Sequence, residues 1–331
     1  MIISEIKKKQ TSDAIASIPE PAKSKIKNII ENATVLLTGG GFTGSGVLLC
    51  SVGDKYYLLT AAHNVLINAK GKKVVKSLKI DDLINNKIDT GKLILDFEDS
   101  CCISFYTVDK TKSSKQKISK ASLVGNWDTD LCLLSFHCEP LEKPCCTLWG
   151  ELNKAELEEK LEKQSEFLRE LNTNVRETIK GKSKYVFIQA GYGMPDGKNA
   201  GMYTGTLNNI NYRVVSFIKK AGGKDFDIGP YDVKIDDSTC LYKDVFLFVS
   251  DNDDTSMPGD SGGPIYGVEL CNNNPDPLIY LVGITLGSDF YKDDEVKVKG
   301  DSQEPDGYKN NAATSTSIPT QPFLDKFDWN R

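Results

Sequence analysis

The sequence has few histidines, no excess of positive charge and no long apolar segment. It contains 331 residues, 2 of them histidines, and 41 Lys and Arg stand against 46 Asp and Glu, a net charge of −5. A chain with a pI near 5.3 gives no electrostatic reason to expect a nucleic acid as a partner. No apolar run approaches the roughly 20 residues that a membrane-spanning helix needs, so no membrane association is expected.

The N-terminal segment and the cysteines together predict a cytoplasmic protein. Residues 1–9 place their charges directly after a short apolar start, without the long apolar stretch of a secretory signal. The 9 cysteines, an odd number with two adjacent pairs, favour reduced thiols over a disulfide framework. Zinc sites use C-x₂₋₄-C pairs or histidine partners, and neither His63 nor His137 stands in such a spacing. We therefore expect no metal and no cofactor.

Short β-prone runs dominate most of the chain. From Ala33 onward, glycines and polar turns separate such runs, and clear examples are residues 46–50, 56–60, 131–136 and 278–286. Many short strands with few helical periods are typical of antiparallel barrels or sandwiches. The length allows one large unit or two compact halves, each with a core that needs no metal or disulfide.

Residues 150–180 break this pattern. Their composition favours a helix, and Leu157, Leu161, Leu168 and Leu171 recur at a spacing of three or four. The predicted helix divides the β-rich part into residues 34–149 and 181–331. An amphipathic helix lying on the protein's own surface is the simpler interpretation, and docking of a regulatory partner is the alternative.

Residues 1–33 are polar and rich in lysine, with a short helix expected around Ser24–Glu31. We interpret them as an N-terminal extension, either a regulatory segment or a pro-segment.

Three short motifs contain the residue types of nucleophilic catalysis. Leu58–His63 is a β-prone run that ends in small residues and a histidine, Asp130 enters an apolar strand, and Ser261 lies in the glycine-rich turn 258–264. A serine hydroxyl is a poor nucleophile until an imidazole takes its proton, and a carboxylate must fix the tautomer of that imidazole. The backbone N–H groups of Gly259 and Ser261 can then face a developing oxyanion.

These motifs, T-A-A-H, D-L-x-L-L and G-D-S-G-G-P in this order, resemble those of the chymotrypsin/trypsin family of serine proteases. The resemblance covers about residues 34–331, including Gly191-Tyr-Gly193 and a segment at 323–329 similar to the family's C-terminal helix. It implies an all-β fold of two antiparallel six-stranded β-barrels, residues 34–149 and 181–331, with the predicted helix inserted between them. The active site would lie in the cleft between the barrels.

The resemblance also implies catalytic roles. Ser261 would be the nucleophile, His63 the general base and acid, and Asp130 the orienting carboxylate. Asp128 competes with Asp130, which is preferred because only Asp130 is followed at once by the apolar strand. The implied function is a serine endopeptidase, regulated within the cell, that cleaves a protein or peptide substrate through an acyl-enzyme. The alternatives are an inactive peptide-binding or scaffold protein and an esterase-like acyl hydrolase.

The sequence departs from the family at its disulfides and at its activation site. Thr43 and Asn64 stand where a cysteine pair would flank the histidine. In trypsin-like zymogens a new N-terminal amine pairs with the aspartate before the serine, here Asp260. A buried carboxylate without a partner is costly. Therefore either cleavage within residues 1–33 supplies an amine, or Asp260 is satisfied locally in a constitutively formed site.

The primary specificity pocket also differs. Thr255, six residues before the serine, would lie at its floor, where trypsin-like enzymes have an aspartate, so a strong preference for Arg or Lys is not predicted. Gly283, Thr285 and Gly287 resemble the pocket wall and the strand that pairs with the substrate backbone. We expect an uncharged residue before the scissile bond, and a long surface loop over residues 289–311 at the rim of the pocket.

Overall fold

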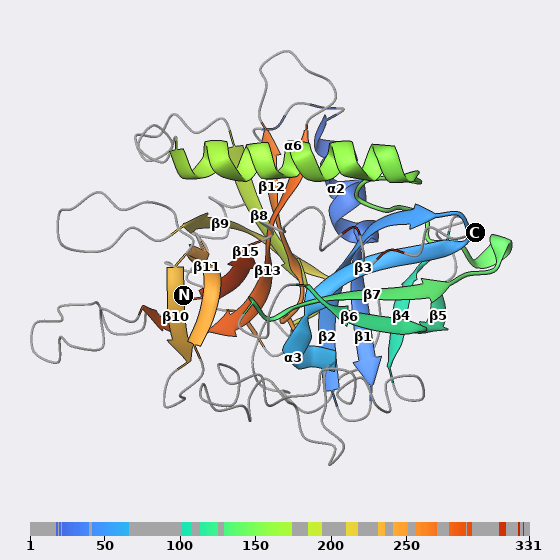
Figure 1. The fold of residues 1–331 in the computed structure, drawn as a ribbon, viewed down its shortest axis with the longest axis horizontal. Coiled ribbons are helices and arrows are strands. Elements are labelled where there is room, and N and C mark those ends of the chain that lie inside the picture. Colours follow the sequence, from blue (N-terminus) through green and yellow to red (C-terminus); the bar gives the residue numbers. More distant parts are fainter. Residues whose placement is uncertain are drawn as a thin grey trace, which may run out of the picture.

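The computed structural model of the chain is mostly β-sheet, and one long helix lies across the described strands (Figure 1). Every described strand pairing is antiparallel, and the strands fall into two sheets. The described residues are 18, 20, 22–39, 42–65, 101–107, 113–124, 129–173, 185–193, 210–217, 231–235, 241–250, 256–257, 259–269, 278–288, 290–292, 311–315, 324 and 327.

The first sheet has seven strands in the order β5-β4-β1-β2-β3-β7-β6. Strands β3 and β7 are largely apolar in sequence, and nearly all of their residues are buried. Ala61, at the end of β3, pairs with Leu131, at the start of β7. The residues that follow β3 and precede β7 therefore lie side by side. The strands are β1 (Thr34–Gly39), β2 (Phe42–Val52), β3 (Lys55–Ala61), β4 (Cys102–Tyr106), β5 (Ser113–Lys117), β6 (Lys120–Leu123) and β7 (Leu131–His137).

The second sheet has eight strands in the order β14-β10-β11-β15-β13-β12-β8-β9, and β9 also pairs with β11. This additional pairing closes β11, β15, β13, β12, β8 and β9 into a ring. The strands are β8 (Tyr185–Gly191), β9 (Asn211–Phe217), β10 (Tyr231–Ile235), β11 (Leu241–Ser250), β12 (Pro264–Glu269), β13 (Ile279–Ser288), β14 (Phe290–Lys292) and β15 (Asn311–Ser315).

The two predicted six-stranded barrels are not confirmed. In the first sheet the edge strands β5 and β6 do not pair with each other within the described residues, so this sheet is open there. In the second sheet β10 and β14 extend beyond the ring. The reason is the length of β11, which offers residues 241–245 to β10, residues 245–248 to β15 and residues 248–250 to β9.

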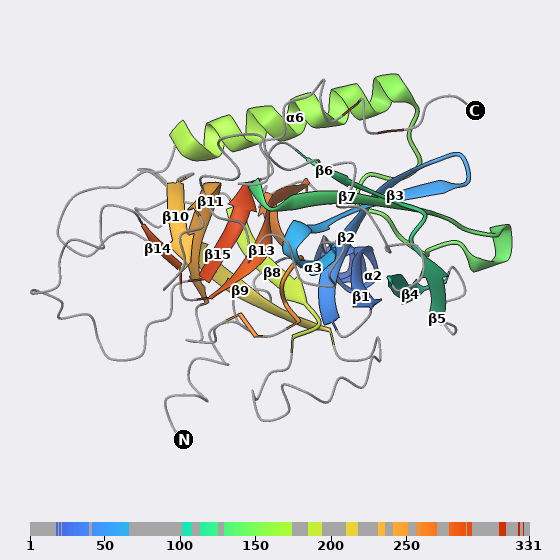
Figure 2. The same cartoon turned by 60° about the horizontal axis from the view of Figure 1, so that its bottom comes forward.

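Helix α6 (Lys154–Thr173) lies within the segment predicted to be helical. Asn153 and Glu156 begin it with a capping box, because Asn153 Oδ1 accepts from the Glu156 N–H at 3.1 Å and Glu156 Oε2 accepts from the Asn153 N–H at 2.8 Å. The helix extends over both sheets (Figures 1 and 2). Its apolar side is buried against the protein itself, as the simpler sequence interpretation predicted.

The apolar side of α6 joins two hydrophobic clusters. Leu157 and Leu161 belong to a cluster built largely on the first sheet, whereas Leu168 and Leu171 belong to a cluster on the second sheet. Helix α2 (Ala22–Ala33) also adds Ile26 and Ile30 to the first cluster, so this part of the N-terminal extension is integral to the core.

The predicted C-terminal helix at 323–329 is described only at Leu324 and Phe327. Both side chains are buried in the first cluster, and the Phe327 ring lies 4.3 Å from the ring of Tyr57, measured between centroids. The described chain therefore returns to the first sheet near its C-terminus, although the helical prediction itself lies outside the described residues.

Two further sequence expectations concern the cysteines and the membrane. The seven cysteines among the described residues form no disulfide. Within the same residues, no helix combines the length and apolar character needed to cross a bilayer.

Candidate active site

His63 and Asp130 are held together by the pairing of β3 with β7. His63 lies in α3 (Ala62–Val65), two residues after the end of β3, and Asp130 directly precedes β7. The Asp130 carbonyl oxygen accepts from the Ala62 N–H at 2.9 Å. Its carboxylate oxygen Oδ1 accepts from the His63 backbone N–H at 2.7 Å, and Oδ2 lies 2.6 Å from His63 Nδ1.

This carboxylate sets the orientation of the imidazole. Asp130 is fully buried and His63 is 7% exposed, so little water competes for their hydrogen bond. In the neutral imidazole, an acceptor at Nδ1 places the proton there and leaves Nε2 as the basic nitrogen. Within the described residues Asp130 is the one non-glycine residue with positive φ, at 48°. This left-handed conformation costs about 1 kcal/mol, and it lets the main chain and the side chain of Asp130 both face Ala62 and His63.

Ser261 lies in the turn before β12, where the two sheets meet. Its carbonyl oxygen accepts from the Ser45 N–H at 2.8 Å and from Asn64 Nδ2 at 2.7 Å, and both donors belong to the first sheet or its α3 turn. On the other side, the Gly262 N–H donates to the Thr285 carbonyl oxygen at 2.7 Å. The turn that contains the serine is therefore fixed to both sheets.

The Ser261 hydroxyl donates to the Leu286 carbonyl oxygen at 2.9 Å. Within the described residues no hydrogen bond joins it to His63. The structure thus places the imidazole–carboxylate pair and the serine turn together at the sheet contact, with the serine side chain in a rotamer directed towards β13.

The backbone N–H groups of the serine turn divide into two sets. Those of Asp260, Gly262 and Gly263 donate to the carbonyl oxygens of Met257, Thr285 and Asp260 respectively. Those of Gly259 and Ser261, the predicted oxyanion donors, have no acceptor within the described residues. Gly259 has φ of 103°, a conformation that favours glycine.

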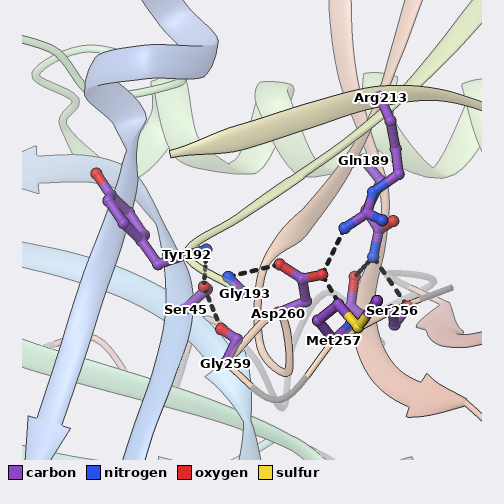
Figure 3. Close-up of polar contacts among 10 residues, drawn as sticks. Ser45, Gln189, Tyr192, Gly193, Arg213, Ser256, Met257, Gly259 and Asp260 are labelled. Carbon is purple, nitrogen blue, oxygen red and sulfur yellow. Dashed lines mark hydrogen bonds and ion pairs between the residues drawn. The ribbon is translucent and has the colours of Figure 1, made fainter. Parts of the chain in front are cut away.

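Ser45 fixes the peptide that precedes Asp260. Its hydroxyl donates to the Gly259 carbonyl oxygen at 2.7 Å and accepts from the Tyr192 N–H at 2.8 Å (Figure 3). Because the Gly259 carbonyl is held from the first sheet, the orientation of the Gly259–Asp260 peptide is also fixed. Sequence reasoning did not identify Ser45, whose partners lie 147 and 214 residues away along the chain.

Asp260 is buried and satisfied within the chain. Its Oδ1 accepts from the Gly193 N–H at 2.8 Å, and its Oδ2 accepts from the Met257 N–H at 3.0 Å and from Arg213 Nη2 at 2.5 Å (Figure 3). These contacts satisfy the carboxylate locally, and a constitutively formed site stays a prediction. The partner Arg213 was missed by sequence reasoning, because a single arginine in the strand 211–217 looks like an ordinary outward-facing residue.

The predicted specificity residues are described only in part. Thr255 and most of the 289–311 segment lie outside the described residues, as does Asp128, whereas Gly283, Thr285 and Gly287 lie on β13. Thr285 is buried, and its hydroxyl accepts from Gln189 Nε2 at 3.1 Å, as does the Ser256 hydroxyl. Gln189 is 1% exposed, and its Oε1 has no hydrogen-bond partner among the described residues.

Comparisons with known proteins do not assign the chain to a family. No protein-family model and no curated protein matches the sequence. Among solved structures, the inactive form of the Rv3671c protease is 12% identical, covers 91% of this chain and 93% of that chain, and has a TM-score of 0.36. A serine-to-alanine mutant of Rv3671c from M. tuberculosis H37Rv, also in an inactive form, is 13% identical with coverages of 91% and 92% and a TM-score of 0.37.

A third similar structure is the passenger domain of Plasmid encoded toxin, an autotransporter enterotoxin from enteroaggregative Escherichia coli. It is 11% identical with a TM-score of 0.38, and the match covers 86% of this chain and 21% of that one. TM-scores this low carry no argument about the reaction, so the functional proposal rests on the geometry of the site.

Proposed function

We propose that the protein is a serine endopeptidase in which Ser261, His63 and Asp130 form the catalytic triad. The observation that carries this proposal is the double contact of Asp130 with His63, which holds both the backbone and the ring of the histidine. A histidine that is merely buried in a core needs one partner for its ring. Here one buried carboxylate fixes both the ring's position and its tautomer, as a general base requires.

In the proposed reaction, Ser261 rotates about χ1 from Leu286 towards His63. His63 Nε2 takes the hydroxyl proton while Oγ bonds to the substrate carbonyl carbon, and the carbonyl oxygen becomes an oxyanion. The imidazolium then gives its proton to the leaving amine as the peptide bond breaks, which leaves an acyl ester on Ser261. Water, activated by the same imidazole, hydrolyses the ester and regenerates the serine. A hydroxyl–imidazole contact that forms only in the substrate complex is common for such sites.

The unpaired N–H groups of Gly259 and Ser261 support the oxyanion assignment. Two donors of one turn that have no acceptor within the described chain are available to a substrate oxygen. Such preorganised donors stabilise a developing negative charge because they need no reorientation during the reaction.

We propose the two-barrel architecture of the chymotrypsin fold, a cytoplasmic location, and a protein or peptide substrate, with no cofactor. Gln189, Ser256 and Thr285 bring uncharged polar groups together next to the serine turn, which supports an uncharged residue before the scissile bond. The charged outer face of α6 is where a regulatory partner would bind.

A fluorophosphonate probe tests the proposed function, because it reacts only with an activated serine. We expect labelling of the intact chain and none of Ser261→Ala, whereas Ser119→Ala, a serine replaced in the connection between β5 and β6, labels normally. Cleavage of a peptide library by the same protein without the probe separates an endopeptidase from an esterase-like hydrolase. A folded protein that neither labels nor cleaves peptides would favour the scaffold alternative.

A further inference from the structure

Arg213 supplies a cation to the carboxylate that lies beside the proposed nucleophile. The two side chains form an ion pair of 2.5 Å, with the Arg213 side chain 11% exposed and that of Asp260 1% exposed. We propose that Arg213 is a positioning residue that holds the serine turn in its active form without a cleaved N-terminus. This inference rests on the proposed function of Ser261 and concerns how that site is formed.

The existing hydrogen bonds of Asp260 already satisfy and neutralise its carboxylate. Its two carboxylate oxygens together accept three hydrogen bonds, from the backbone of Gly193, the backbone of Met257 and the guanidinium of Arg213. The guanidinium neutralises the buried charge, and the two backbone donors complete its hydrogen bonding. Arg213 therefore supplies the positive charge that an N-terminal amine would otherwise bring to this carboxylate.

The backbone around Asp260 is also closely packed. A side-chain carbon added at Gly191 or at Gly193 would overlap the Asp260 carboxylate. These glycines are therefore required because the carboxylate lies directly against their backbone, with space for hydrogen only. An α-amine would have to compete with Arg213 for this carboxylate.

The ion pair acts on the reaction through the backbone. Asp260 stands between Gly259 and Ser261, whose N–H groups are the proposed oxyanion donors. Its side chain ties this turn to Gly193 after β8 and, through Arg213, to β9. Without the guanidinium, a buried unpaired carboxylate would move towards water and would carry the turn with it. The N–H groups of Gly259 and Ser261 would then no longer point at the same substrate oxygen.

Kinetics of Arg213→Gln test this role. We expect kcat to fall by about 10²–10³-fold, the size of effect seen when oxyanion donors are lost, while KM changes less than threefold. Arg213→Lys, which keeps the charge, should recover at least tenfold of the lost kcat. Arg169→Gln, the same substitution on the exposed side of α6, is the matched control and should leave both constants unchanged. A kcat of Arg213→Gln within twofold of the unmodified enzyme would overturn the proposal.

A second pair of variants covers the case in which Arg213→Gln does not fold. Arg213→Met combined with Asp260→Asn removes both charges, and such neutral replacements of a buried pair usually keep the fold. We expect this double variant to be folded and at least tenfold slower in kcat. Full activity of the folded double variant would show that the ion pair does not position the turn.

Backbone amide exchange separates this inference from the proposed function. The N–H groups of Gly193 and Met257 should be protected in the unmodified chain and in Ser261→Ala, and should lose protection in Arg213→Gln. Retained protection in Arg213→Gln overturns the inference, even for a protein that cleaves nothing. Intact mass of the fluorophosphonate-labelled protein should show residues 1–33 still attached, and labelling confined to a chain cleaved within residues 1–33 would contradict the inference.

Discussion

The side-chain amide of Asn64 donates to the carbonyl oxygen of Ser261 at 2.7 Å. Asn64 follows His63 in α3, so one hydrogen bond links the turn of the proposed base to the turn of the proposed nucleophile. In the family that the motifs resemble, a cysteine stands at this position and braces its own barrel. Here a buried amide at the same place braces the contact between the two sheets.

Replacing Asn64 by alanine should misalign the two halves of the site. The Ser261 carbonyl would keep only its bond from the Ser45 N–H. We expect about a tenfold fall in kcat and a loss of about 1 kcal/mol in the free energy of unfolding, measured with a peptide substrate and by urea denaturation. Asn32→Ala removes a comparable amide–carbonyl bond inside α2 and should leave kcat unchanged. Equal kcat values for the two variants would contradict this role.

Replacing Asp130 by asparagine should abolish most of the activity while keeping the fold. The new amide would donate to His63 Nδ1, which places the imidazole proton on Nε2 and leaves no base for the serine. We expect kcat to fall by about 10⁴-fold, with a melting temperature near that of the unmodified protein. His137 and Asp54 provide the control, because they form a similar pair of 3.3 Å at the surface. Asp54→Asn should therefore have no effect on kcat.

Replacing Gln164 by alanine should loosen α6 from the second sheet. Gln164 is 4% exposed, donates to the Leu281 carbonyl oxygen and accepts from the Leu281 N–H at 3.1 Å. Leu281 pairs with Tyr266 of β12, and the register of the two strands shifts next to this pair. Loss of these two hydrogen bonds to a buried strand should cost about 2–4 kcal/mol in urea denaturation. Gln116→Ala, on the surface strand β5, should lower the free energy of unfolding by less than about 1 kcal/mol. Equal losses in the two variants would show that the hydrogen bonds to the Leu281 backbone do not stabilise the fold.

The adjacent cysteines Cys101 and Cys102 should differ in reactivity. Burial, and to a smaller extent the neighbouring Cys102, raises the pKa of Cys101 from 9.0 to about 12. Because the pKa is raised, Cys101 stays a thiol throughout pH 7–10, and its thiolate fraction at pH 8 is about 10³-fold below that of an ordinary cysteine. Iodoacetamide at pH 8 should modify the half-buried Cys102 first, as read by tandem mass spectrometry. Equal labelling in the folded protein would contradict the buried position of Cys101.

The positions of most strands and of the long helix were predictable because they follow from local patterns. Short apolar runs bounded by glycines gave the strands, and the leucine spacing gave the helix around Leu157–Leu171. The triad candidates were predictable because His63, Asp130 and Ser261 each stand in a distinctive motif. Their roles remain proposals, although the structure brings all three to the contact between the sheets.

The residues that hold the site and the helix in place were not predictable, because their contacts join distant parts of the chain. Arg213 lies 47 residues from Asp260, and Asn64 lies 197 residues from Ser261. Nothing near Gln164 in the sequence indicates that it pairs with the backbone of β13. The strand number was missed for a related reason, since one long strand, β11, serves three partners. Such sharing depends on the three-dimensional path of the chain and leaves no local pattern.

Helix α6 packs one end on the sheet that carries His63 and the other on the sheet that carries Ser261. The two sheets also meet through hydrogen bonds at the serine turn, so loss of either sheet would expose buried surface of the other. We therefore expect the molecule to melt as a single cooperative unit, because neither half retains a complete core alone. Activity and structure should then disappear together on heating.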